Sequence, residues 1–177
     1  MKNSRFLIYK TIKYDLSHLN SFIHEFLHEA GGKSARTYRV KILFSHHCFT
    51  EGKKSGDDPQ LEFLDGGPKR DHRTFDAIRW ELSQYLPDII RGLMGRHIAH
   101  THHNSFFTVD IVDQNGTSIE YEVYFEVALV KKELYLTVTT AFSRDPANLG
   151  ARPRGGKIRF STILFNVSQN KPIKSVK

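Results

Sequence analysis

The sequence contains a single cysteine, Cys48, among 177 residues, so no disulfide can form within the chain. A lone thiol is typical of proteins in a reducing compartment, where disulfides are rare. Long apolar runs are also missing, and the segment Met1–Tyr14 holds only the short stretch Phe6–Tyr9 between charged neighbours. A secretory signal and a membrane span each need a longer run. We therefore expect a cytoplasmic protein that does not contact the membrane.

Internal repeats and long low-complexity segments are absent as well. With 177 residues and 39% hydrophobic content, the chain can bury a substantial core, and a single domain is the simplest expectation. The charge is unbalanced, because 26 Lys and Arg face 19 Asp and Glu, for a net charge of +7. Such a surface attracts polyanions, and nucleic acid is the commonest polyanion in cells.

The clearest pattern present is the alternation of apolar and polar residues through Ser105–Phe142. Three alternating runs are separated by Gln114-Asn115-Gly116 and by a turn at Val130–Glu133. Residues that tolerate positive φ favour hairpin turns, and alternation indicates strands with one buried face. The segment therefore predicts an antiparallel meander. We expect an α+β fold in which this sheet packs against two amphipathic helices.

Two segments have the apolar spacing of such helices. The first ends at Gly31-Gly32, and the second, within residues 75–93, is kinked or restarted by Pro87. Two further strands are expected, at Thr37–Ser45 and Lys157–Phe165. The apolar residues of the first helix are Leu16, Leu19, Ile23, Phe26, Leu27 and Ala30.

The remaining segments are predicted from composition. Residues 51–73 form a long polar loop with one short strand at Leu61–Leu64, and a loop of that length is commonly functional. Phe6–Tyr14 suits a short edge strand. Residues 166–177 form a basic tail that ends at Lys177.

The first chemical motif, His24-Glu25-Phe26-Leu27-His28, matches the pattern H-E-x-x-H. On a helix, His24 and His28 would share a face and could bind one Zn²⁺ while Glu25 activates its water. No third ligand follows, since Ser34 stands where a further histidine would be needed. Solvated histidines on an ordinary amphipathic helix explain the motif better. A zinc-dependent hydrolase is therefore the weaker alternative, and we expect no cofactor and no metal.

Other histidines gather in two places. His46 and His47 stand at the end of a predicted strand, and four more lie in the connector at residues 96–104. Imidazole exchanges protons near neutral pH and is a common metal ligand, although a histidine-rich connector is more often simply solvated. Cys48 could ligate a metal, but the sequence shows no base that would activate it as a nucleophile.

Carboxylates mark the polar face of the meander, at Asp110, Glu120, Glu122 and Glu126. They could bind a divalent cation or form an acid and base pair. Cross-strand pairing with basic residues of neighbouring strands explains them better.

A basic loop follows the meander, from Arg144 through Arg152 and Arg154 to Lys157. Arginines separated by Gly and Pro can reach phosphates with forked donors, so these four residues are candidate nucleic-acid ligands. A plain solubilising loop would have the same composition.

From Phe75 onward, the order of a helix, a meander and a closing strand resembles that of the barnase, colicin and RelE-type ribonuclease toxins. The local similarity is limited to Leu136–Phe142, with the letters LTVTTAF. The resemblance implies that acid, base and phosphate-binding residues lie on the sheet and its rims. In this chain those positions are His46 or His47, Arg73, Thr139 and Arg144.

Two main functional hypotheses follow. In the first, the protein is an intracellular, metal-independent endoribonuclease of toxin or mobile-element type, with a histidine as base and Arg73 or Arg144 stabilising the phosphorane. In the second, it is a non-catalytic module that binds nucleic acid or another protein within a larger assembly. RNA is the favoured partner over DNA, and a protein partner or inhibitor is a further expectation.

Overall fold

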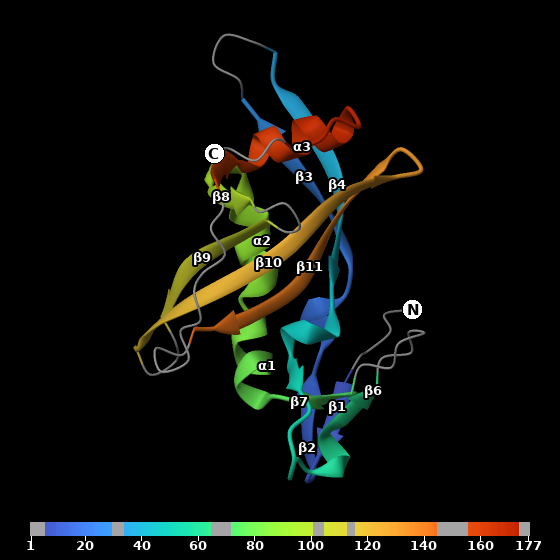
Figure 1. Ribbon diagram of the computed structural model, residues 1–177, viewed down its shortest axis with the longest axis vertical. Coiled ribbons are helices and arrows are strands. Elements are labelled where there is room, and N and C mark those ends of the chain that lie inside the picture. The colour runs from blue at the N-terminus through green and yellow to red at the C-terminus, as the bar shows by residue number, and fades with distance from the viewer. Residues whose placement is uncertain are drawn as a thin grey trace.

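The computed structural model describes residues 6–29, 34–64, 72–100, 105–112, 116–144 and 156–173. A strongly twisted seven-stranded sheet dominates these residues, with its strands in the order β12-β8-β9-β10-β11-β4-β3 (Figure 1). The predicted α+β class is confirmed. The strands of this sheet are β3 (Phe22–His28), β4 (Arg36–Phe44), β8 (His97–His100), β9 (Ser105–Val112), β10 (Ser118–Val130), β11 (Glu133–Ser143) and β12 (Gly156–Arg159).

The predicted meander is confirmed as β9, β10 and β11, which pair antiparallel in sequence order. Tyr121, Val123 and Phe125 of β10 are completely buried on one face, as the alternation requires. Gly116 has φ +81° at the turn into β10. The next hairpin closes with only two residues, Lys131 and Lys132, whose φ values of +49° and +68° are those of a type I′ turn.

The predicted strand at Thr37–Ser45 is also confirmed, since β4 covers Arg36–Phe44. It pairs with β11, with Ile42 opposite Leu136, and this is the only parallel pair among the described strands of the sheet. Val40 and Ile42 are fully buried, which places β4 at the centre of the core.

The predicted first helix is wrong. Residues 17–19 form a short 3₁₀ turn, η1 (Ser17–Leu19), and the rest of the segment is the edge strand β3. Ile23 and Leu27, which belonged to the predicted helical stripe, are each 51% exposed, whereas Phe26 is buried. The seven-residue pairing of β3 with β4 supplies backbone hydrogen bonds and core packing that outweigh the helical spacing.

The second predicted helix is confirmed as two pieces, α1 (Ala77–Ser83) and α2 (Leu86–Arg91). Asp76 caps α1 by accepting hydrogen bonds from the backbone N–H groups of Ile78 and Arg79. Pro87 restarts the helix within the first turn of α2. A 3₁₀ turn, η4 (Gly92–Gly95), follows, and the three elements run behind β10 and β11 (Figure 1).

The predicted last strand, Lys157–Phe165, is wrong beyond its first three residues. Strand β12 ends at Arg159 and the chain continues at once as a helix, α3 (Phe160–Ser168). Phe160, Ile163 and Leu164 are fully buried, a spacing of three and four residues that suits a helix better than a strand. Part of the predicted basic tail is therefore helical. Phe160 contacts Phe26 and Phe125, so α3 covers the interior face of the sheet at the end opposite the N-terminal hairpin.

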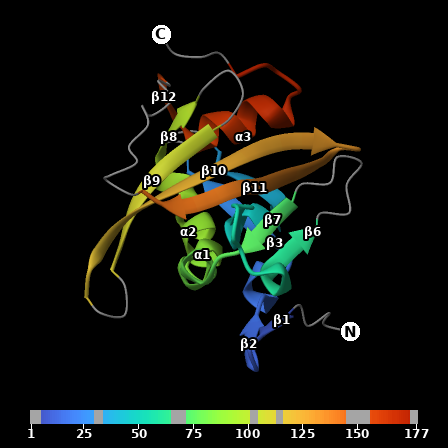
Figure 2. The same cartoon turned by 60° about the horizontal axis from the view of Figure 1, so that its bottom comes forward.

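The other end of the molecule carries two small sheets (Figure 2). The hairpin of β1 (Phe6–Tyr9) and β2 (Ile12–Asp15) replaces the single edge strand that we expected. The segment predicted as a long polar loop contains most of a three-stranded sheet, β5 (Thr50–Gly52), β6 (Glu62–Leu64) and β7 (His72–Phe75), with a 3₁₀ turn, η3 (Pro59–Leu61). Within the described ranges, no helix is long and apolar enough to span a bilayer.

Candidate functional site

The H-E-x-x-H motif lies on the strand β3, where it lacks the geometry of a zinc site. Residues four apart in a strand share a face but are separated by about 13 Å. The ring of Phe26 lies between the two imidazoles, with its centroid 4.5 Å from that of His24. His24 and His28 therefore cannot bind the same ion. No group of three or more metal-ligating side chains was found among the described residues.

His46 and His47 do lie together, on the 3₁₀ turn η2 (His46–Cys48). Their ring centroids are 4.5 Å apart, and the ring of His46 stacks on Phe63 at 5.4 Å. The side chain of Ser45 caps the turn by accepting from the backbone N–H of His47. Cys48 is fully buried, and this burial raises the pKa of its thiol to about 12, so it is not a nucleophile in the folded protein.

Arg73 is near these histidines, but its guanidinium is bound to the backbone around Thr50. Its Nε donates to the Thr50 hydroxyl at 2.8 Å and its Nη2 to the Thr50 carbonyl at 3.0 Å. A second guanidinium, Arg79 of α1, donates to the carbonyls of His47 and Thr50 at 3.3 and 3.0 Å. Arg79 was not among the residues predicted from the sequence, and burial lowers the pKa of its guanidinium. Both arginines hold η2 in place.

Thr139 and Arg144 also have structural roles. Thr139 is the extra residue of a β-bulge, because Tyr124 pairs with Thr140 and Phe125 with Val138. Arg144 forms an ion pair with the buried Glu122, at 2.5 Å between Nη1 and Oε1. The Glu122 carboxylate also accepts from the hydroxyl of Tyr124, whose pKa is raised to about 12 by burial and by this carboxylate.

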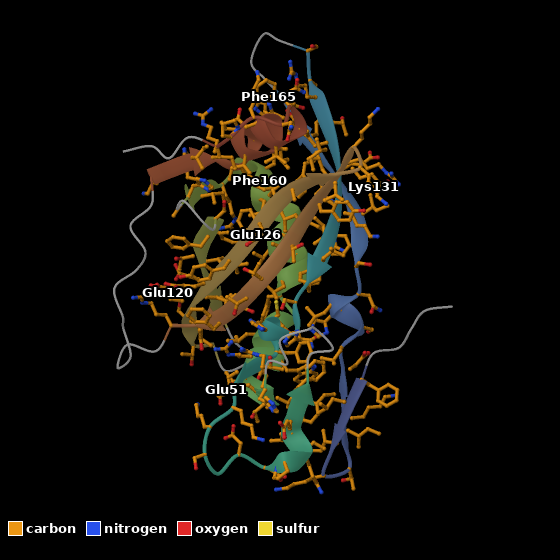
Figure 3. The ribbon with its side chains drawn as sticks, turned by 45° about the vertical axis from the view of Figure 1, so that its right-hand side comes forward. Glu51, Glu120, Glu126, Lys131, Phe160 and Phe165 are labelled. Atoms are coloured by element: carbon orange, nitrogen blue, oxygen red, sulfur yellow. The ribbon has the colours of Figure 1, made fainter. Side chains whose placement is uncertain are left out.

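The other predicted ligands are scattered. Arg152 and Arg154 lie outside the described residues, as do His102 and His103 of the histidine-rich connector. Lys157 is exposed on the edge strand β12, and strands β8 and β9 separate it from β10. Figure 3 shows two carboxylates of β10, Glu120 and Glu126. The predicted nucleic-acid ligands Arg144 and Lys157 are therefore not brought together at one site.

A different site forms where β12 runs directly into α3. The first turn of α3 contains no acidic residue, and the side chain of its N-cap residue, Arg159, makes no capping hydrogen bond. Among the described residues, Phe160 is the one residue of this turn whose N–H group has a backbone partner, the carbonyl of Arg96. Free N–H groups at a helix N-terminus, together with the helix dipole, favour an anion. Arg159 is the residue that precedes this turn, and it faces His97 across the β8–β12 pair.

Two adjacent pockets open beside this helix terminus. The larger has a volume of about 570 Å³ and lies between α3 and the ends of β3 and β4. The smaller, of about 340 Å³, lies between β3, η4 and β12. His28 and Ser161 line both pockets, so the two pockets are neighbours at the start of α3.

Cationic side chains surround these pockets. Arg36 lines the larger pocket, and Arg96, His97 and Arg159 line the smaller one together with a single carboxylate, Glu29. His28 stands opposite Arg36 in the β3–β4 register. We call the two pockets and these residues the α3 site. The sequence could have revealed it only if the Arg-Phe-Ser-Thr segment at 159–162 had been recognised as a helix start.

Comparison with known proteins gives a family. The family model described as the YjaZ family matches residues 6–168. The chain belongs to the YjaZ family. It is 26% identical over 160 residues to Protein YjaZ of Escherichia coli strain K12, an alignment that covers 90% of this chain and 87% of that protein. No solved structure matches the chain. The family match includes every element of the α3 site.

Proposed function

We propose that this YjaZ-family protein is a cytoplasmic nucleic-acid-binding module that holds phosphates at the α3 site. One observation carries the proposal: three arginines and two histidines, from four strands and a turn, surround an uncapped helix N-terminus. Arginine binds phosphate oxygens with paired donors, and backbone N–H groups add further donors. The net charge of +7 supports long-range attraction of the same ligand.

RNA in single-stranded form suits this site better than duplex DNA. The cations surround two short pockets at one end of the molecule, beside the start of α3. A duplex is usually recognised by an element laid along a groove, whereas a single strand can bend its phosphates into separate pockets.

Fluorescence anisotropy with a labelled single-stranded RNA tests the proposal. The logarithm of the affinity should fall linearly with the logarithm of salt concentration, with a slope that reports the number of phosphates contacted. Replacing Arg96 and Arg159 by Gln should weaken binding about tenfold and make the slope shallower.

The matched control removes two positive charges at the other end of the molecule. Lys53 and Lys54 lie beside the small three-stranded sheet, where each pairs with a glutamate. Replacing both by Gln should change the affinity less than twofold, since exposed ion pairs distant from the ligand contribute little. An equal loss of RNA affinity in both double variants would show that binding depends only on net charge. That result would contradict the proposed site.

A second candidate function, a metal-independent endoribonuclease, rests on the contact between His46 and His47. Two imidazoles 4.5 Å apart could serve as base and acid in RNA cleavage. The test is incubation of total RNA with purified protein in the presence of a chelator. Cleavage that both His46→Ala and His47→Ala reduce would support this function. Cleavage unaffected by either substitution, or no cleavage by the wild type, would eliminate it.

A further inference from the structure

We infer that the larger pocket of the α3 site binds a phosphate monoester, the terminal group of a nucleotide or of an RNA chain. This inference rests on the proposed function and names the ligand group of that site. It depends on Tyr38, a residue of β4 that lines the pocket and that no sequence pattern indicated.

Tyr38 is a buried side chain whose hydroxyl has no hydrogen-bond partner among the described residues. The residue is only 7% exposed and stands opposite Phe26 in the β3–β4 register, on the interior face of the sheet. A buried hydroxyl without a partner costs about 1–3 kcal/mol. A ligand that brings an oxygen against this hydroxyl would remove that cost, because the hydroxyl would then donate to it.

The remaining walls supply further donors. Ser161 and Thr162 bring two hydroxyl groups and the free N–H groups of the first turn of α3. Arg36 enters from β4, where its guanidinium lies 5.0 Å from the ring centroid of Phe165. This contact holds the guanidinium beside the pocket, and Figure 3 shows Phe165 on α3 at this end of the molecule.

The number of donors distinguishes a terminal phosphate from an internal one. A phosphodiester has two free oxygens and one negative charge. A phosphate monoester has three free oxygens and carries about 1.5 to 2 negative charges at neutral pH. The forked guanidinium of Arg36, the three hydroxyls and the helix N-terminus together offer more donors than a diester can use. The volume of about 570 Å³ is within the range of pockets that hold small ligands.

The experiment compares two RNA oligomers of identical sequence, one with a 5′-phosphate and one with a 5′-hydroxyl. Wild-type protein should bind the phosphorylated oligomer about tenfold more tightly, as expected for hydrogen bonds to a charged group. Tyr38→Phe and Arg36→Gln should each reduce this preference, which is the ratio of the affinities that one variant has for the two oligomers.

The control for Tyr38→Phe is Tyr121→Phe. Tyr121 is also fully buried with no recorded partner for its hydroxyl, but it lies in the core of β10 rather than in the pocket. The Tyr121→Phe variant should keep the preference of the wild type for the phosphorylated oligomer. Equal affinity of the wild type for both oligomers would overturn the inference, as would a preference that Tyr38→Phe does not change.

Titration calorimetry with adenosine 5′-monophosphate and with inorganic phosphate shows whether the bound monoester belongs to a free small molecule or to the end of an RNA chain. Competition by the mononucleotide would assign the pocket to free monoesters, whereas binding of the phosphorylated oligomer alone would assign it to chain ends. Failure of the proposed function has a different signature. In that case neither oligomer binds even at low salt, although the mononucleotide still binds the wild type and not Tyr38→Phe.

Discussion

At the scale of single residues, Glu122 shows how charge is used inside this protein. Its side chain is 1% exposed, and its carboxylate is satisfied by Arg144 and by the hydroxyl of Tyr124. The ring of Tyr124 stacks between those of Phe106 and Phe142 on the same face of the sheet. Arg144 therefore neutralises a buried charge, a structural role that the sequence alone did not indicate.

Arg144→Met should lower the free energy of unfolding by about 3 kcal/mol, because it leaves the buried carboxylate of Glu122 without its counter-charge. The affinity for RNA should be unchanged. Urea denaturation and anisotropy measure the two effects separately. The double variant Glu122→Gln with Arg144→Met should be more stable than the sum of the single changes predicts. A variant of full stability that has lost RNA binding would refute this assignment.

At the scale of elements, the hairpin of β10 and β11 contains local strain. A two-residue type I′ turn needs positive φ at both positions, and Asn followed by Gly is the favoured pair. Here both positions are lysines, Lys131 and Lys132, whose side chains are exposed at the hairpin tip (Figure 3). Side chains with a Cβ are disfavoured in this conformation. The thirteen-residue strand β10 and its partner β11 maintain the turn nonetheless.

Lys131→Asn combined with Lys132→Gly should therefore raise the free energy of unfolding, by about 1 kcal/mol, since both new residues accept positive φ. Chemical denaturation at fixed ionic strength measures the gain. Lys53→Asn with Lys54→Gly serves as the comparison, because neither residue is recorded at positive φ. Equal gains in the two double variants would show that the loss of charge, rather than turn geometry, is responsible.

At the scale of the whole molecule, a hydrogen bond helps to connect the N-terminal segment to the helices beneath the sheet. His18 of η1 and Ser83 of α1 are joined by a hydrogen bond of 2.7 Å between Nε2 and Oγ. Ser83 Oγ donates in turn to the carbonyl of Trp80. Burial lowers the pKa of His18 below 6.5, against the opposing effect of Asp15. The folded protein therefore favours the neutral imidazole.

Acidification should destabilise the fold through His18. Because the pKa is lower in the folded state, the unfolded chain binds more protons between the two pKa values, so the stabilisation is complete above 6.5 and is lost as the pH falls below it. Denaturation midpoints measured from about pH 7.5 to about pH 5.5 should fall for the wild type. The decline should be smaller in His18→Gln, and an identical decline in both proteins would contradict the role of His18.

Much of the fold was predictable where one pattern dominates. The alternation in β9, β10 and β11 and the spacing in α1 and α2 indicate those elements without tertiary information, and the structure confirms them. In β3 and α3 two patterns compete. Phe26 fits both a helical stripe and one face of a strand. The spacing of Ile158, Phe160 and Leu164 likewise fits a helix and a strand, so local spacing did not decide between the two.

The candidate site was less predictable than the fold. The contact between His46 and His47 follows from their adjacency in sequence. Arg73 lies on β7 of the small three-stranded sheet rather than on the meander. That its guanidinium binds the backbone of Thr50 could not be inferred from residue types. Tyr38 falls within the predicted strand Thr37–Ser45, and its residue type does not reveal whether the hydroxyl has a partner. Its unsatisfied hydroxyl becomes evident only when α3 is placed over β4.

The sequence by itself determined the basic charge, the meander and the helix that breaks at Pro87, because these depend on composition and on neighbours a few residues apart. Only the tertiary structure decided that the first predicted helix is an edge strand and that the last strand becomes α3. It also brought Arg36, Tyr38, Arg96 and Arg159 around one helix terminus. Pairing and burial between distant segments outweigh local preference, since backbone hydrogen bonds and core packing depend on the partner strand as much as on the segment itself.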